Sequence, residues 1–95
     1  MIPWEDLEKA ISIAKKYSVG RMYLIGSALH KESEEVNDYD FAVLDVPPEN
    51  FFKFYGEIMR ELSKSVDIID LSGKMTKFKN IVMEEGKVVY DRSAA

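Results

Sequence analysis

A glycine–serine pair and a pair of aspartates, each beside an apolar run, constrain this chain more than any other feature. Gly26-Ser27 ends one apolar run, and Asp38 and Asp40, after ten intervening residues, begin another. The pattern predicts one strand that ends at the glycine and a second that starts at the aspartates. Because strand side chains alternate with period two, the two carboxylates would point to the same face of a sheet.

Paired carboxylates and a glycine turn together suit a metal-bound triphosphate. Hard divalent cations such as Mg²⁺ bind carboxylate oxygens along with substrate phosphates. A glycine turn that leads into a helix offers phosphates free backbone N–H groups. Taken alone, Asp-x-Asp is also a common turn before a strand, and Gly-Ser is a common strand-to-helix turn. The combination at this spacing favours a site for metal and nucleotide.

Composition limits the class of protein. The 95 residues are expected to form a single domain, 1–95, and a hydrophobic content of 46% can build its core. The absence of cysteine excludes disulfides, zinc thiolates and thiol catalysis. No run of residues has transmembrane length, and the N-terminus lacks a signal-peptide core, so a cytoplasmic location is expected. A net charge of −4 argues against broad nucleic-acid binding.

Hydrophobic periodicity predicts that helices and strands alternate. In the first helix Trp4, Leu7, Ile11 and Ala14 recur at helical spacing, and Gly20 is expected to stop that helix. Residues 31–37 are expected to form a polar loop, and 92–95 a frayed end. The expected helices cover 3–17, a segment from 48 that carries a buried stripe to 62, and 76–85 with Thr76 as a cap, and the expected strands cover 21–25, 39–44, 66–71 and 87–91.

This alternation predicts an α/β (α+β) domain, a small sheet backed by helices on one face. The aspartates would then lie on its open face. Such a half-open domain is thinly stabilised alone, so a partner surface is expected, and self-association is left open. The dense aromatic run Phe51, Phe52, Phe54 and Tyr55 cannot all face one way on a helix. One or two of these side chains should be exposed or meet a partner.

The chain resembles the minimal nucleotidyltransferase family of the DNA polymerase β superfamily. The resemblance rests on residues 24–27 and 37–43, at the family's own ten-residue spacing. Residues 65–71 look like the strand that carries the family's third carboxylate, and 81–90 look like its closing helix and strand. The resemblance covers nearly the whole chain. It implies a polymerase-β-like fold with a small mixed sheet.

The resemblance also implies roles for individual residues. Asp38 and Asp40 would bind two Mg²⁺ ions, and Asp67 would join them and help take the proton of the attacking hydroxyl. Gly26 and Ser27 would contact the β- and γ-phosphates of ATP. We favour Asp67 as the third carboxylate because it lies where the family's acid falls, before an apolar pair.

Two features leave alternatives open. Asp70 competes with Asp67; the two lie three apart on a strand, so they face opposite sides. Many relatives carry arginines shortly after Gly-Ser, whereas this chain has His30 and Lys31. Lysine lacks the bidentate fork of arginine, so triphosphate affinity is the property that this departure affects. His30 is expected to be a solvated loop residue, with a phosphate contact as the alternative.

Short members of this family are often encoded beside a helical HEPN-domain protein and act as the antitoxin of that pair. The resemblance therefore implies transfer of AMP from ATP to a tyrosine of a HEPN-type toxin. One alternative is a non-catalytic module that neutralises a partner by occlusion. Another is an antibiotic-type, small-molecule nucleotidyltransferase, for which this chain has no room for an acceptor-binding domain.

Overall fold

The computed structural model describes residues 2–29, 36–73 and 76–94, and it confirms the expected alternation of elements. Each expected strand is present, with its ends within one residue of expectation. In chain order the elements are α1 (Trp4–Lys16), β1 (Arg21–Ile25), the 3₁₀ turn η1 (Gly26–Leu29), β2 (Asp38–Leu44), α2 (Pro48–Glu61), β3 (Ser65–Asp70), α3 (Thr76–Glu85), β4 (Lys87–Asp91) and the 3₁₀ turn η3 (Arg92–Ala94). The expected side-chain cap at Thr76 and the expected loop at 31–35 lie outside what the structure describes.

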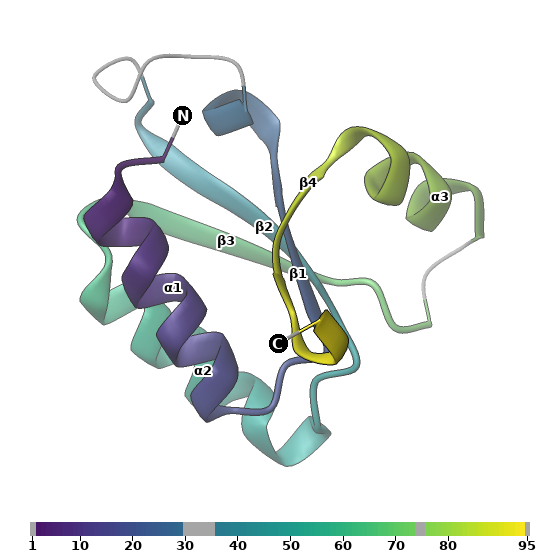
Figure 1. The fold of residues 1–95 in the computed structure, drawn as a ribbon, viewed down its shortest axis with the longest axis horizontal. Coiled ribbons are helices and arrows are strands. Elements are labelled where there is room, and N and C mark those ends of the chain that lie inside the picture. Colours follow the sequence, from purple (N-terminus) through teal and green to yellow (C-terminus); the bar gives the residue numbers. More distant parts are fainter. Residues whose placement is uncertain (1, 30–35, 74–75, 95) are drawn as a thin grey trace.

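The four strands form one mixed sheet in the order β3-β2-β1-β4 (Figure 1). β1 runs antiparallel to both β2 and β4, whereas β2 and β3 are parallel. A parallel pair needs a crossover connection, and α2 supplies it between β2 and β3. The two central strands, β1 and β2, therefore carry the residues at the heart of the domain.

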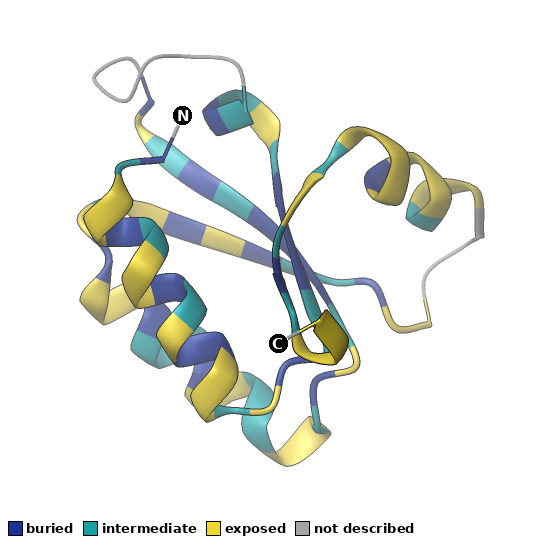
Figure 2. Cartoon of the chain, in the orientation of Figure 1, coloured by how far each residue is buried: buried dark blue, intermediate teal, exposed yellow. Residues whose placement is uncertain are grey.

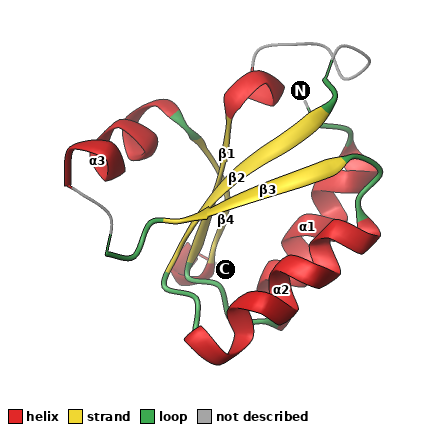
Figure 3. Cartoon of the chain, turned by 180° about the vertical axis from the view of Figure 1, so that it is seen from behind, coloured by secondary structure: helices red, strands yellow, loops and turns green. Residues whose placement is uncertain are grey.

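Helices α1 and α2 lie side by side on one face of the sheet, and α3 lies away from them (Figures 1 and 3). The main core fills the space between α1, α2 and that face. Its fully buried side chains include Met22 of β1, Tyr39 and Phe41 of β2, and Phe54 and Ile58 of α2. Figure 2 shows the resulting alternation of buried and exposed residues along β3. None of the described helices has the length and apolarity that crossing a membrane requires.

The small mixed α/β fold predicted from the sequence is confirmed, and within it the second face of the sheet is partly covered as well. Val82 of α3 packs in a separate cluster with Tyr23, Ala42 and Leu71. Tyr23 and Ala42 alternate with the main-core residues on their strands, so this smaller cluster lies on the opposite face. α3 thus covers the part of that face that lies next to β1.

The first helix buries a different stripe from the one that its apolar spacing suggests. Ala14 is buried as expected, but Trp4 is 66% exposed. The helix ends at Lys16, and Ser18 rather than Gly20 adopts the positive φ, 61°, that follows it. Gly20 is instead required by a close approach, because a Cβ there would lie 2.7 Å from that of Asp45.

A buried carboxylate ties α1 to the sheet. Asp6 is only 4% exposed, and its Oδ2 accepts a hydrogen bond of 2.7 Å from the Tyr39 hydroxyl. Ser63 donates to the same carboxylate through its hydroxyl and through its backbone N–H. These three donors satisfy a charge that would otherwise be costly to bury.

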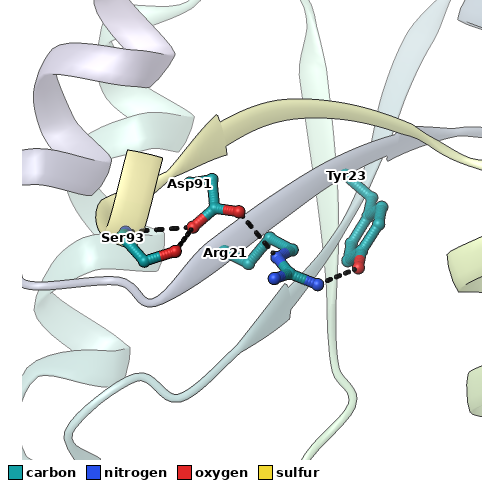
Figure 4. Close-up of polar contacts among 4 residues, drawn as sticks. All are labelled: Arg21, Tyr23, Asp91 and Ser93. Carbon is teal, nitrogen blue, oxygen red and sulfur yellow. Dashed lines mark hydrogen bonds and ion pairs between the residues drawn. The ribbon is translucent and has the colours of Figure 1, made fainter. Parts of the chain in front are cut away.

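The C-terminal residues 92–94 are ordered, so the expected frayed end is wrong for them. The Arg92 N–H donates to the carbonyl of Gly20 at 2.9 Å. Asp91 accepts hydrogen bonds from Ser93 and from the Nε of Arg21, whose Nη1 also donates to the Tyr23 hydroxyl (Figure 4). The end of β4 is thereby fastened to the start of β1.

The exposed aromatic side chain expected on the second helix is also present. Phe54 is fully buried, whereas Phe52, two positions earlier, is 83% exposed. Phe51 lies between these extremes and meets the ring of Phe52 edge-on. The run therefore splits between the core and the surface, as its density predicts.

Replacing Asp6 with alanine should lower the free energy of unfolding by about 2–4 kcal/mol, because the Tyr39 hydroxyl and the Ser63 N–H lose their acceptor. Burial acts to raise the pKa of Asp6, but the hydrogen bonds from Ser63 and Tyr39 outweigh it, so the pKa lies below its usual 3.8. The stabilising contribution of the ionised Asp6 carboxylate is thus complete above the usual aspartate pKa, and it is lost as pH falls through the lowered pKa. Urea unfolding at pH 7 and pH 3 measures both effects. Equal losses for Asp6→Ala and for the exposed control Glu5→Ala would contradict the assignment.

Candidate active site

The strand register brings three aspartates together on one face of the sheet. Asp40 of β2 lies directly opposite Asp67 of β3 on one side and opposite Ile25 of β1 on the other. Asp38 lies two residues before Asp40 and shares its face. Tyr39, between them, points into the main core, so this is the face opposite α1 and α2. We call Asp38, Asp40 and Asp67 the aspartate cluster.

Asp70, the alternative third carboxylate, lies on the other face. It pairs with Val43 in the register of β2 and β3, and Val43 belongs to the main core. Its Oδ1 accepts a hydrogen bond of 3.0 Å from the N–H of Ser72, which closes the turn after β3. The structure therefore places Asp67, rather than Asp70, beside the aspartate pair. The roles of these residues stay predictions.

Gly26 packs directly against the carboxylate of Asp40. Its φ of +75° is a conformation that side chains rarely adopt. A Cβ at this position would lie 2.5 Å from the Oδ2 of Asp40, so the carboxylate would have to move aside. The backbone turn thus favours glycine here, and a side chain would also displace the carboxylate of Asp40. The sequence spacing indicated that the two motifs are related, but not that they touch.

The aspartate cluster is electrostatically unfavourable by itself. Partial burial raises the pKa of Asp40, and the negative charges of Asp38 and Asp67 raise it further. Asp38 and Asp67 therefore lie close enough to Asp40 for their charges to act on it. A positive charge among them would reverse this effect and favour the ionised forms.

The donor set fits a divalent cation by its chemistry. Three carboxylates provide the hard oxygen ligands that Mg²⁺ prefers, and one of them is partly desolvated. Among the described residues, however, no three His, Cys, Asp or Glu side chains are already gathered as a metal-binding group. Asp38, Asp40 and Asp67 are the residues that could hold a cation, with some adjustment of their side chains.

Ser27 lies in η1, immediately after the glycine. η1 spans only four residues, Gly26–Leu29, so it has too few aligned peptides to act as a helix dipole. Any phosphate bound here would be held by backbone N–H groups and by the Ser27 hydroxyl. His30 and Lys31, the candidates to replace the family's arginines, lie outside the described residues.

Asp6 has a positioning role that sequence reasoning missed. Its carboxylate accepts a hydrogen bond from the hydroxyl of Tyr39, the residue between the two β2 aspartates, and so anchors that stretch of β2 to α1. The available signal was weak, because an acid in the first turn of a helix is ordinarily a solvated residue that favours the helix dipole. Only the tertiary contact with Tyr39 and Ser63 distinguishes it.

Comparison with known families and structures agrees with this geometry. The family model for the polymerase beta nucleotidyltransferase domain matches residues 8–95. Comparison with curated protein sequences gives no match.

Among solved structures, the chain is similar to a complex of a tri-AMPylated HEPN toxin with an MNT antitoxin from Shewanella oneidensis, with a TM-score of 0.67 and 21% identity over 94% of this chain and 72% of that one. It is also similar to a toxin–antitoxin structure with AMP-PNP, with a TM-score of 0.69 and 21% identity over 93% and 75% of the two chains. A third is a mutant MntA–HpeT toxin–antitoxin with two aspartate-to-glutamate substitutions, with a TM-score of 0.72 and 19% identity over 93% and 75%. At these identities the likeness concerns the fold.

Replacing Gly26 with alanine should disrupt cation binding, because the new methyl group would displace the Asp40 carboxylate. Gly73 offers a matched control: its φ is +76°, but nothing lies within 4 Å of a Cβ built there. Both variants should lose about 1 kcal/mol of stability from backbone strain. Only Gly26→Ala should weaken Mn²⁺ binding, by roughly tenfold or more, in isothermal titration calorimetry. Equal Mn²⁺ affinities in the two variants would show that the contact with Asp40 is irrelevant to the site.

Proposed function

The chain belongs to the polymerase β nucleotidyltransferase family, and we propose that it transfers AMP from ATP to a hydroxyl group of a protein acceptor. The observation that carries this proposal is the line of groups across the sheet. Gly26 follows β1, Asp40 lies on β2, and Asp67 lies on β3, with Ile25, Asp40 and Asp67 in register. A phosphate-binding turn and two carboxylates are thus in a row on one face.

This row suits an in-line displacement at phosphorus. With the β- and γ-phosphates at Gly26-Ser27, the α-phosphorus would lie near Asp40. An acceptor oxygen beside Asp67 would then approach from the side opposite the leaving group. Asp67 is exposed on an outer strand of the sheet, so a large acceptor can reach it. The leaving group, the α-phosphorus and the attacking oxygen would therefore lie along a line that crosses the strands.

In the proposed step a bond forms between the acceptor oxygen and the α-phosphorus, and the bond from that phosphorus to the β-phosphate's bridging oxygen breaks. Pyrophosphate leaves, and the hydroxyl proton passes to an oxygen of Asp67. Asp38 and Asp40, joined by Asp67, would hold Mg²⁺. Bound in that position, two such ions would neutralise charge on the attacking and leaving oxygens. Ser27 would orient the departing phosphates.

We propose a tyrosine of a HEPN-type toxin as the acceptor, which would make the chain an antitoxin. Support comes from similar structures, which include a tri-AMPylated HEPN toxin bound to an MNT antitoxin and a toxin–antitoxin with AMP-PNP. The exposure of Asp67 agrees with an acceptor that a second protein supplies. Since ATP is the substrate, the cytoplasm remains the expected compartment.

A second candidate is neutralisation of a partner by occlusion alone. Large apolar side chains are exposed on α1 and α2, away from the aspartate cluster, and they favour it. The clearest are Trp4, Phe52 and Met59. A surface of this kind can bind a partner without any chemistry at the aspartates.

Exchanging Asp38 and Asp40 for asparagine together should abolish transfer of label from α-labelled ATP to a HEPN-type toxin that the wild-type protein modifies. The substitution removes two negative charges from the site and preserves side-chain volume. Asp70→Asn, on the opposite face, is the matched control and should retain full transfer. Loss of transfer with an intact complex supports catalysis. Full toxin neutralisation by the double variant, measured by growth, would instead establish occlusion.

Asp67→Asn separates chemistry from binding. If Asp67 takes the acceptor proton, this variant should lower the single-turnover rate of AMP transfer by roughly a hundredfold or more. Its affinity for the acceptor protein should stay within about twofold of the wild type, because an exposed carboxylate contributes little to binding. Rapid quenching and calorimetry provide the two measurements. An unchanged transfer rate would remove Asp67 from the reaction.

A further inference from the structure

A hollow of about 310 Å³ lies beside Gly26, on the same face as the aspartate cluster. Its walls come from two sides. β1 and η1 provide Ile25 and Leu29 next to the glycine, and α3 provides Ile81, Val82 and Glu85. Ile25 is the register partner of Asp40, so the hollow begins one strand away from the aspartates. Gly26 both lines this hollow and touches Asp40.

We propose that this hollow binds the nucleobase of the triphosphate, an inference that rests on the proposed function. The aliphatic side chains of Ile25 and Leu29 face a wall built by Ile81 and Val82 of α3. Ligand pockets are typically such concave apolar surfaces with a few polar groups. The base is joined through the ribose to the α-phosphate, so a base held there requires the nucleoside to fold back from Asp40 over Gly26, beside the phosphates at the glycine–serine turn.

Glu85 gives the hollow a chemical preference. Among the described residues that line the hollow, it is the charged one. An ionised carboxylate only accepts hydrogen bonds. The amino group of adenine can donate to it, whereas the carbonyl oxygens that flank the N3–H of uracil would be repelled. The hollow should therefore accept ATP and disfavour UTP.

The shape of the hollow depends on a close approach between β1 and the end of α3. A Cβ at Gly86 would lie 2.7 Å from the Val82 carbonyl oxygen and 3.0 Å from the Cγ2 of Ile25. Glycine at this position thus allows α3 to sit against β1, where Val82 is buried. Ile81 itself is 45% exposed, so it can be changed without disturbing that contact.

The test compares two ligands on two variants. Ile81→Ser removes apolar surface from the hollow, and Met83→Ser is the control: Met83 is 39% exposed on the same helix but does not line the hollow. Calorimetry with Mg²⁺ measures the affinity for ATP and for tripolyphosphate, which has no base. Ile81→Ser should weaken ATP binding by about fivefold or more and leave tripolyphosphate binding unchanged. Met83→Ser should change neither affinity.

A further variant tests the preference directly. Glu85→Gln adds a donor to the side chain, so it should reduce the ratio of ATP to UTP affinity by about threefold or more. Wild-type protein that binds ATP and tripolyphosphate equally would overturn this inference and leave the proposed function standing. The inference would also be overturned, with the proposed function left standing, if Ile81→Ser weakened only the complex with the partner protein. The hollow would then be a docking site. If wild-type protein binds neither ligand, the proposed function fails, and the nucleobase site fails with it.

Discussion

The alternation of side chains along β2 is the constraint on which both the core and the site depend. Tyr39, Phe41 and Val43 are buried on one face, while Asp38 and Asp40 occupy the other. A shift of the strand register by one residue would exchange the two sets and bury the acids. The core therefore fixes the direction of the aspartates, and the hydrogen bond from Tyr39 to Asp6 anchors the segment between them. The same seven residues of β2 thus determine both the packing of the core and the position of the aspartates.

The negative charges of the aspartate cluster repel one another, so electrostatics opposes the assembly of the site. Partial burial and two neighbouring carboxylates raise the pKa of Asp40, and Gly26 leaves room for that carboxylate, which a Cβ at this position would displace. None of this stabilises the fold, since like charges in partial burial oppose one another. Such a cluster is consistent with selection for binding a positive ion. Stability comes instead from the opposite face, where α1 and α2 cover the main core.

Period-two alternation accounts for the strands and for the opposite orientations of Asp67 and Asp70, whereas the preference for Asp67 came from the family resemblance. The spacing of three between Asp67 and Asp70 was enough to predict opposite faces. By contrast, the burial of Asp6, the contact of Gly26 with Asp40 and the placement of Val82 on the second face depend on residues far apart in sequence. Helical periodicity alone favoured Trp4 for the buried stripe, whereas its exposure is set by where α1 meets the sheet. The order at 92–94 arises in the same way, from a contact with the Gly20 carbonyl.

Under the proposed function, the mixed topology would keep the two substrates apart in space. In the strand order β3-β2-β1-β4, Asp67 lies on one outer strand, and the hollow lies beyond β1 on the other side of Asp40. If the base occupies that hollow, ATP enters from the α3 side, and the β3 side stays free for the acceptor hydroxyl. The acceptor need not displace any part of the nucleotide to reach the α-phosphorus. In the proposed reaction the sheet would itself set the direction of attack, and recognition of the acceptor would be left to the acceptor protein.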